Sequence, residues 1–347
     1  MPVTEEAVLN SLRSVEDPDL KRDVVSLGFI KKLNIEGGRV SFDLELTTPA
    51  CPLKAQLKTA AEEAVRRIEG VTEVNVEVTS NVSAHRVPGS EEILPDVKNI
   101  VAIASGKGGV GKSTVSVSLA VALAKSGARV GLLDTDIYGP SIPIMMGVTE
   151  KPEIKGEKLI PIEKYGVSLM SIGFMIPEDT PLIWRGPMVM KAVDQLLTDV
   201  EWGELDYLLM DLPPGTGDVQ LTLSQKVPLT GAVIVTTPQD VALLDVVRGI
   251  SMFRKLNVPI LGVIENMSFF SCPHCGGRSD IFSHGGGAAA SKKLDVPFLG
   301  EIPIDLKIRE GGDAGKPVPA DDLDSASGRV FMDIGEQLAA RISALGL

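Results

Sequence analysis

The stretch IVAIASGKGGVGKST, residues 100 to 114, decides the fold of this chain. A short apolar run is followed by a glycine-rich loop and then by the apolar periodicity of a helix. The loop GKGGVGKS fits the phosphate-binding pattern G-x-x-x-x-G-K-[ST] in the strand–loop–helix setting that this pattern requires. Backbone N–H groups of such a loop surround phosphate oxygens, and the helix N-terminus adds its dipole. The sequence therefore predicts a nucleotide-binding P-loop.

The loop also assigns a chemistry to its polar residues. We expect Lys112 to meet the β- and γ-phosphates and the Ser113 hydroxyl to bind Mg²⁺. The other loop positions expected to contact the nucleotide are Gly106, Lys107, Gly108, Gly109, Val110, Gly111 and Thr114.

Short apolar runs without alternation continue after the loop, including RVGLLD, YLLMD, GAVIVTT and ILGVIEN. Such runs are typical of strands buried on both faces of a parallel sheet. Helical stretches such as DVALLDVVRGISMFRKL lie between them. This alternation predicts an α/β domain over residues 99–347, with a doubly wound, mostly parallel sheet and its ligand at the carboxyl ends of the strands.

Carboxylates follow two of the predicted strands. Asp134 and Asp136 come after RVGLL, and Asp211 ends YLLMD in the manner of a Walker B acid. Beside a phosphate loop, these groups can hold Mg²⁺-bound waters and orient the attacking one. On this basis we expect Lys112 and Asp211 to be catalytic residues, and the family resemblance described below adds Lys107 and Asp136 to them.

The front of the chain has a different pattern. RVSFDLEL alternates strictly, and residues 53–68 have helical apolar spacing. Residues 1–85 are predicted to form a small α+β domain. The polar, proline-containing stretch that follows indicates a linker at 86–98.

Composition narrows the class of protein. The net charge of −12 disfavours nonspecific binding to nucleic acid or to anionic membranes. Three cysteines in 347 residues form no disulfide framework, and no apolar stretch reaches the ~18 residues of a membrane span. The first residues lack the basic and apolar regions of a signal peptide. We expect a cytoplasmic protein.

The second lysine of the loop, Lys107, resembles the deviant Walker A motif of dimerising ATPases, which include septum-site, partition, nitrogenase-reductase and arsenite-pump proteins. The resemblance implies that Lys107 reaches the nucleotide of a partner subunit. It also implies that Asp136 positions water and that the Gly215 N–H senses the γ-phosphate. Adenine would be framed by Asn266 and, more weakly, by Pro303 and Asp305. The chain lacks the N-K-x-D guanine signature, which favours ATP over GTP.

The loop SCPHCGG holds two of the three cysteines of the chain, Cys272 and Cys275. Four readings are open: a redox pair, a zinc site completed by His284, two inert buried thiols, or half of a cluster site. Iron–sulfur clusters take about four ligands. If Lys107 indicates a dimer, a two-fold axis can bring four thiolates together around a 4Fe-4S cluster.

The motifs GKGGVGKST, DTDIYGPSIP, DLPPGTGD, TTPQDVALLDV and VIENMSFFSCPHCG, in this order, resemble the Mrp/ApbC-type iron–sulfur cluster carrier ATPases. The front domain, with DPDL and TTPACPL, is similar to the SufT-like iron–sulfur assembly domain. The resemblance implies a cluster bound at Cys272 and Cys275, and Cys51 has the position of that domain's cysteine. One departure is Ser283, where glycine is expected.

We therefore expect a homodimeric ATPase that receives clusters from scaffold or donor proteins and delivers them to apo iron–sulfur proteins, with ATP, Mg²⁺ and the cluster as its ligands. One alternative is a partition or septum-site type ATPase that acts on DNA or membrane. Another is a reductase that donates electrons through a permanent cluster. The acidic charge and the cysteine pair both disfavour the first alternative.

Overall fold

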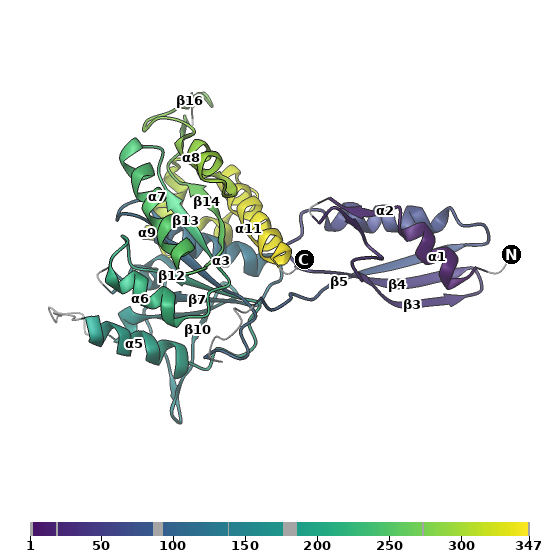
Figure 1. Cartoon of the computed structure of the whole chain (residues 1–347), viewed down its shortest axis with the longest axis horizontal. Helices are drawn as coiled ribbons and strands as arrows, with labels where there is room; N and C mark the ends of the chain where they lie inside the picture. Colours follow the sequence, from purple (N-terminus) through teal and green to yellow (C-terminus); the bar gives the residue numbers. More distant parts are fainter. Residues whose placement is uncertain are drawn as a thin grey trace. The chain divides into compact units, whose positions relative to one another are not determined.

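A computed structural model represents the chain (Figure 1). It describes residues 3–18, 20–85, 93–137, 139–175, 186–272 and 274–345. These form two compact units, one of Met1–Ser83 with Ala339–Leu347 and one of Ala84–Leu338. Residues 86–92 of the expected linker lie outside the described residues.

The smaller unit is built on a three-stranded sheet of β3 (Ile30–Glu36), β4 (Arg39–Leu46) and β5 (Glu73–Ser80). Apolar residues alternate along β4, so Val40, Phe42 and Leu44 face one side of the sheet and form a core. Helices α1 (Glu5–Leu12) and α2 (Lys54–Arg66) complete this core. β3 pairs with β4 antiparallel, whereas β4 and β5 are parallel and joined through α2. A short ribbon of β1 (Glu16–Asp17) and β2 (Arg22–Asp23) precedes the sheet. The predicted α+β front part is confirmed.

The larger unit holds an eight-stranded sheet in the order β10-β11-β7-β12-β6-β13-β14-β17. Every pair is parallel except β10 with β11 at one edge. Every residue of β6, β7, β12 and β13 is buried, because helices cover both faces of the sheet, and this explains why their sequences do not alternate. The bounds are β6 (Ile100–Ala104), β7 (Val130–Asp134), β10 (Ile162–Lys164), β11 (Val167–Ser171), β12 (Tyr207–Asp211), β13 (Gly231–Thr236), β14 (Ile260–Glu265) and β17 (Phe298–Glu301).

The strand order reverses around β6, which lies between β12 and β13 although β7 is the next strand in the chain. In open α/β sheets, ligands bind beyond the carboxyl ends of the strands at such a reversal. The helices of this unit are α3 (Lys112–Lys125), α4 (Ile142–Met145), η1 (Ile172–Met175), α5 (Gly186–Thr198), α6 (Asp218–Lys226), α7 (Asp240–Lys255), α8 (Gly286–Leu294), α9 (Leu306–Asp313), α10 (Val318–Asp321) and the first part of α11 (Ala326–Ala344), whose residues from Ala339 onward belong to the smaller unit. Two hairpins complete it: β8 (Ile154–Lys155) with β9 (Lys158–Leu159), and β15 (Phe270–Ser271) with β16 (Arg278–Ser279).

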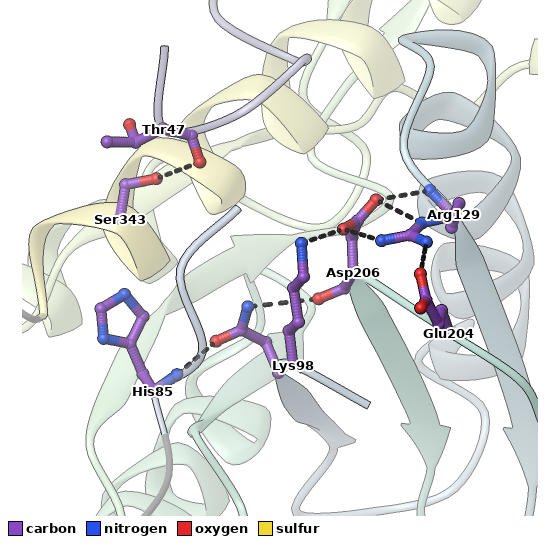
Figure 2. Close-up of polar contacts among 8 residues, drawn as sticks. Thr47, His85, Lys98, Arg129, Glu204, Asp206 and Ser343 are labelled. Atoms are coloured by element: carbon purple, nitrogen blue, oxygen red, sulfur yellow. Dashed lines mark hydrogen bonds and ion pairs between the residues drawn. The ribbon is translucent and has the colours of Figure 1, made fainter. Parts of the chain in front are cut away.

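A polar network surrounds Asp206 where β12 begins (Figure 2). Lys98 Nζ lies 3.0 Å from its carboxylate, and Arg129 Nη2 lies 3.2 Å from it. Burial raises the pKa of the Asp206 carboxyl, but the hydrogen bonds from Arg129 and Lys98 outweigh burial and lower it. Asn99 donates to the Asp206 carbonyl and accepts from the His85 N–H. This network joins the chain entering β6 to the neighbouring strands at the edge opposite the phosphate loop.

Candidate functional site

The phosphate loop runs from the end of β6 to the first residue of α3, as the motif predicts. Gly109 and Gly111 have φ of +80° and +79°, a region that side-chain-bearing residues seldom adopt. A Cβ on Gly111 would lie 2.2 Å from Asn266 Nδ2. Asn266 in turn donates to the Val110 carbonyl at 2.8 Å. The loop therefore needs glycine for both its backbone shape and its close contact with the end of β14.

Four polar side chains meet where β12 ends. Lys112 Nζ lies 2.7 Å from Asp211 Oδ2, and the Ser113 hydroxyl donates to the same oxygen at 2.7 Å. Ser116, one turn further along α3, donates to Asp211 Oδ1 at 2.5 Å. Lys112, Ser116 and Asp211 are all buried. The sequence motifs predict Lys112, Ser113 and Asp211 but not Ser116, which its position three residues after Ser113 on a helix could have indicated.

Asp134 and Asp136 lie beside this cluster. Asp134 faces Asp211 across the parallel pair of β7 and β12 and is fully buried. Burial, together with the negative charge of Asp211, raises the pKa of Asp134 to about 7. Its carboxyl accepts from the Asp136 N–H at 3.0 Å and from the Ser171 hydroxyl at 2.9 Å. Asp136 Oδ2 lies 3.6 Å from Lys112 Nζ, so the expected water-positioning carboxylate does lie next to the phosphate loop.

The start of the loop is joined to the segment after β12. The Gly215 N–H donates to the Ser105 carbonyl at 2.9 Å, and the Ser105 hydroxyl donates to the Lys107 carbonyl at 2.9 Å. A Cβ on Gly106 would lie 2.2 Å from Asp245 Cβ of α7, so the loop also packs closely on that helix.

A cavity of about 740 Å³ opens beside the loop. Its wall includes five positions named from the sequence, namely Gly111, Thr114, Asn266, Pro303 and Asp305. The volume and mixed lining are typical of a pocket for a small organic ligand. The Asp305 carboxylate caps α9 through the Lys307 N–H and accepts from Ser327, so Asp305 shapes the wall with its side chain already engaged.

The apolar part of this wall was not foreseen. Much of it comes from two separate segments, Ile144–Met145 of α4 and Ile281–Phe282 after the β15–β16 hairpin, and from Ile308 of α9. These residues are scattered in the sequence and carry no motif, so only the fold brings them together.

The cysteine pair lies on the β15–β16 hairpin, which projects beyond α8 in Figure 1. The Cys272 N–H donates to the Gly277 carbonyl at 2.9 Å, and the Gly276 N–H donates to the Cys272 carbonyl at 2.8 Å. The N–H groups of His274 and Cys275 and the Cys275 thiol also donate to the Cys272 sulfur and lower the pKa of this thiol. Cys272 is half-buried and Cys275 is exposed, while Pro273 lies outside the described residues. The two thiols are therefore presented together on a closed turn.

Arg278 and its neighbours attach this hairpin to the rest of the unit. The Arg278 guanidinium lies 3.9 Å from the centre of the Phe269 ring and is 2.6 Å from His284 Nδ1. It also pairs with Asp280 at 3.0 Å and with Glu301 at 3.5 Å. His284, which the zinc reading needs, thus lies against Arg278. Across the described ranges, we find no group of three or more histidine, cysteine or acidic side chains arranged to hold a metal ion.

Ser283 has φ of +92°, in the left-handed region that favours glycine. This agrees with the glycine expected at this position from the resemblance. Cys51 belongs to the smaller unit, where it is half-buried, just before α2. None of the helices described here is both long and apolar enough to span a membrane.

Comparison with known proteins gives two family matches. A family model described as NUBPL iron-transfer P-loop NTPase matches residues 96–339. A second model, described as iron-sulfur cluster assembly protein, matches residues 5–78.

Relatives match along nearly the whole chain. An iron-sulfur cluster carrier protein of Synechocystis is 49% identical over 351 residues, covering 99% of each chain. One of Deinococcus radiodurans is 48% identical, covering 97% of this chain and 95% of the relative. The iron-sulfur cluster transfer protein NUBPL of Dictyostelium discoideum is 50% identical, covering 76% of this chain and 83% of the relative.

Among solved structures, a nucleotide-binding protein of Archaeoglobus fulgidus in complex with ADP is similar with a TM-score of 0.60 and 39% identity. The match covers 67% of this chain and 92% of the Archaeoglobus protein. The cell division ATPase MinD of Pyrococcus furiosus has a TM-score of 0.52 at 24% identity, and the match covers 69% of this chain and 97% of the MinD chain. At this identity, the likeness supports the fold alone. The predicted P-loop fold and the resemblance to cluster carriers are confirmed. From residue 96 to residue 339, the chain belongs to the family of NUBPL iron-transfer P-loop NTPases, and it carries an iron–sulfur cluster assembly domain in front.

Proposed function

We propose that this protein is a homodimeric, ATP-hydrolysing carrier that holds an iron–sulfur cluster between two subunits and passes it to apoproteins. One observation carries the proposal. Asn266, which binds the phosphate loop, and Cys272 belong to the same segment leaving β14. A nucleotide site and a thiol pair on one segment are what a nucleotide-dependent carrier needs, and relatives covering nearly the whole chain are named iron-sulfur cluster carrier protein.

The ATP half of the proposal rests on the cluster around Asp211. Lys112 lies where it can neutralise the β- and γ-phosphates, and Asp136 lies beside it to orient the attacking water. The Ser113 hydroxyl and the Asp211 carboxylate, 2.7 Å apart, are the hard oxygen donors that suit Mg²⁺. Ser113 would hold the ion directly and Asp211 would hold one of its waters. When bound, Mg²⁺ neutralises charge that develops on the transferred phosphate.

The base would lie in the 740 Å³ cavity, against Asn266, Pro303 and Asp305. A similar solved protein is described as a nucleotide-binding protein in complex with ADP, which supports nucleotide binding by this fold. The Gly215 N–H, which donates a hydrogen bond to Ser105 at the start of the phosphate loop, would sense the γ-phosphate.

The cluster is the cargo of the proposed reaction. Cys272 and Cys275 supply two thiolates, and the lowered pKa of Cys272 favours the deprotonated form that binds iron. Hydrogen bonds to cluster sulfurs also tune iron–sulfur sites. A second copy of the chain supplies the other two ligands of a 4Fe-4S cluster, and Lys107 contacts that copy's nucleotide. Cys51 would assist transfer or contact with acceptors.

Donor or scaffold proteins would load the cluster in the cytoplasm, where thiols stay reduced. The net charge of −12 supports neither DNA nor anionic membrane as a partner. The names of the relatives favour transfer over partition and over electron donation from a permanent cluster.

Anaerobic reconstitution with iron and sulfide tests the proposal. We expect about four irons per dimer in the wild type and close to none in Cys272→Ala or Cys275→Ala, because two thiolates cannot hold the cluster. Cys51→Ala is the matched control and should load normally. The loaded wild type should pass its cluster to an apo 4Fe-4S enzyme within minutes.

A strictly monomeric loaded protein, one zinc per chain at this loop, or a cluster that never leaves would each contradict the proposal.

A further inference from the structure

The cysteine hairpin and the nucleotide cavity share a wall. Ile281 and Phe282 follow β16 after one intervening residue, and both line the cavity beside Gly111 and Asn266 of the phosphate site. Ile281 is 56% exposed and Phe282 is 37% exposed, so their apolar surface is open to whatever occupies the cavity. On the other side of the hairpin, Met267 also lines the cavity.

A buried carboxylate fixes both ends of the segment that carries the hairpin. Glu265, at the end of β14, is fully buried. It accepts from the Ser268 hydroxyl at 2.7 Å, before the hairpin, and from the Gly287 N–H, at the start of α8 after it. The next residue, Asn266, donates to the phosphate loop. The anchor of the hairpin and the contact to the phosphate loop are therefore consecutive residues.

Close to these anchors, the backbone has unusual conformations on both sides of the hairpin. Met267 has φ of +55° and Ser283 has φ of +92°, although neither is glycine. Such conformations are strained for residues with a side chain, and they cluster at sites that switch or clamp a ligand. Met267 itself lines the cavity, and Ser283 follows Phe282 of the cavity wall.

The hairpin also contacts the strand end that carries the rest of the wall. The Ile304 N–H donates to the Phe269 carbonyl at 2.6 Å, and Arg278 reaches Glu301 at the end of β17. Pro303 and Ile304 line the same cavity. A ligand there touches both segments that hold the hairpin.

We propose that a bound nucleotide packs on Ile281 and Phe282 and thereby orders the cysteine hairpin, so that these two positioning residues couple the nucleotide to Cys272 and Cys275. The inference rests on the proposed function, since it takes the cavity as the nucleotide site. In physical terms, contact with the nucleotide lowers the freedom of a segment that is bent at Met267 and Ser283, and the thiol pair sits between these bends. The occupant of the cavity then sets how firmly the two sulfurs are held.

Hydrogen exchange of the reduced full-length protein, with and without saturating MgADP, tests this coupling. In the wild type, we expect ADP to slow exchange of peptides spanning 268–284 by about fivefold. Phe282→Ala should weaken ADP binding by about fivefold through lost apolar contact. At ADP concentrations that restore full occupancy, its hairpin should still exchange as in the free protein.

Two further variants complete the design. Ile281→Ser should behave like Phe282→Ala, and because both side chains are partly exposed, thermal melting should remain that of the wild type. Ile154→Ala is the matched control: Ile154 is 74% exposed, lies on β8 and is not part of the cavity wall. It should keep both ADP affinity and the nucleotide-dependent slowing.

If ADP binds the wild type and leaves hairpin exchange unchanged, or if Phe282→Ala at full occupancy is slowed as much as the wild type, the coupling is refuted while cluster loading and transfer still support the carrier function. If ADP does not bind the wild type at all, the proposed function fails and the coupling fails with it.

Discussion

The carboxyl of Asp134 is held in an environment that opposes its charge. It is fully buried, it faces Asp211 on the adjacent strand, and its pKa is raised to about 7. Lys112 Nζ forms its closest ion pair with Asp211, at 2.7 Å, so the positive charge of the lysine mainly stabilises the Asp211 carboxylate and not that of Asp134. One proton on Asp134 therefore relieves repulsion between two carboxylates at the phosphate site.

This environment predicts a particular pH dependence of stability. Below the ordinary pKa of 3.8, Asp134 is protonated in both the folded and unfolded chain. As the pH rises from there to about 7, the unfolded chain loses the proton while the folded chain keeps it. The contribution of this group to stability is therefore lost across that window and stays lost above it.

Asp134→Asn removes this titration. Relative to the wild type, we expect the variant to gain stability as the pH rises from 5 to 7.5, by about 1–4 kcal/mol in total. Thermal or urea unfolding of both proteins across this range measures the difference. A difference that is the same at every pH would show that Asp134 ionises normally.

The junction of β6, the phosphate loop and α3 is the element on which nucleotide binding depends. Gly111 is the N-cap of α3 with φ of +79°, so the first N–H groups of the helix point into the loop. The Asn266 side chain fills the space where a Cβ would be. The helix α3, the phosphate loop and the end of β14 are therefore in close contact at Gly111.

Gly111→Ala should disturb this fit. An alanine at this φ costs about 1–2 kcal/mol. Its Cβ would also push Asn266 away from the Val110 carbonyl. We expect ATP affinity, measured by calorimetry, to fall by more than about tenfold because the N–H cradle is displaced. Gly156→Ala is the matched control, with φ of +65° and nothing within 4 Å of the added Cβ, and it should lose stability but keep ATP affinity. Equal affinities in the two variants would contradict this account of the loop.

For the molecule as a whole, the proposed function requires two copies. A chain presents Cys272 and Cys275 on one hairpin, while a cluster takes about four ligands. Lys107 lies at the start of the phosphate loop and is half-buried, next to the contact between Gly106 and α7. Under the proposed function, dimer formation, ATP hydrolysis and cluster binding would therefore be linked in one assembly.

Lys107→Ala separates these events. Because Lys112 and the loop backbone are intact, ATP affinity should stay within about twofold of the wild type. ATP-dependent dimerisation should be lost, and ATPase activity should fall by about tenfold or more, since a charge on the transferred phosphate is no longer neutralised by the partner. Sedimentation with and without ATP, and phosphate release, measure these effects.

Lys155→Ala, on the exposed hairpin of β8 and β9, is the control and should dimerise and hydrolyse ATP normally. A Lys107→Ala protein that did the same would contradict the role of this lysine.

Several features of the fold and the candidate site followed directly from the sequence. The phosphate loop, the buried strands β6, β7 and β12, the carboxylates Asp134, Asp136 and Asp211, and the cysteine pair are each carried by a short run of residues. Glycines at fixed spacing define a loop, and unbroken apolar runs define buried strands, because these depend on backbone sterics and local burial. Polar residues at the carboxyl ends of parallel strands then converge by the geometry of the sheet.

Other parts of the site depended on how distant segments pack. Ser116 reaches Asp211 only because α3 lies along β12, and Phe282 lines the cavity only because the chain after β16 folds back toward the phosphate loop. Glu265 joins Ser268 to Gly287 across a hairpin whose path no local pattern specifies. Local motifs thus determined which chemistry this protein carries. Tertiary structure decided which side chains share one cavity, because such contacts arise from the free energy of packing elements that lie far apart in the chain.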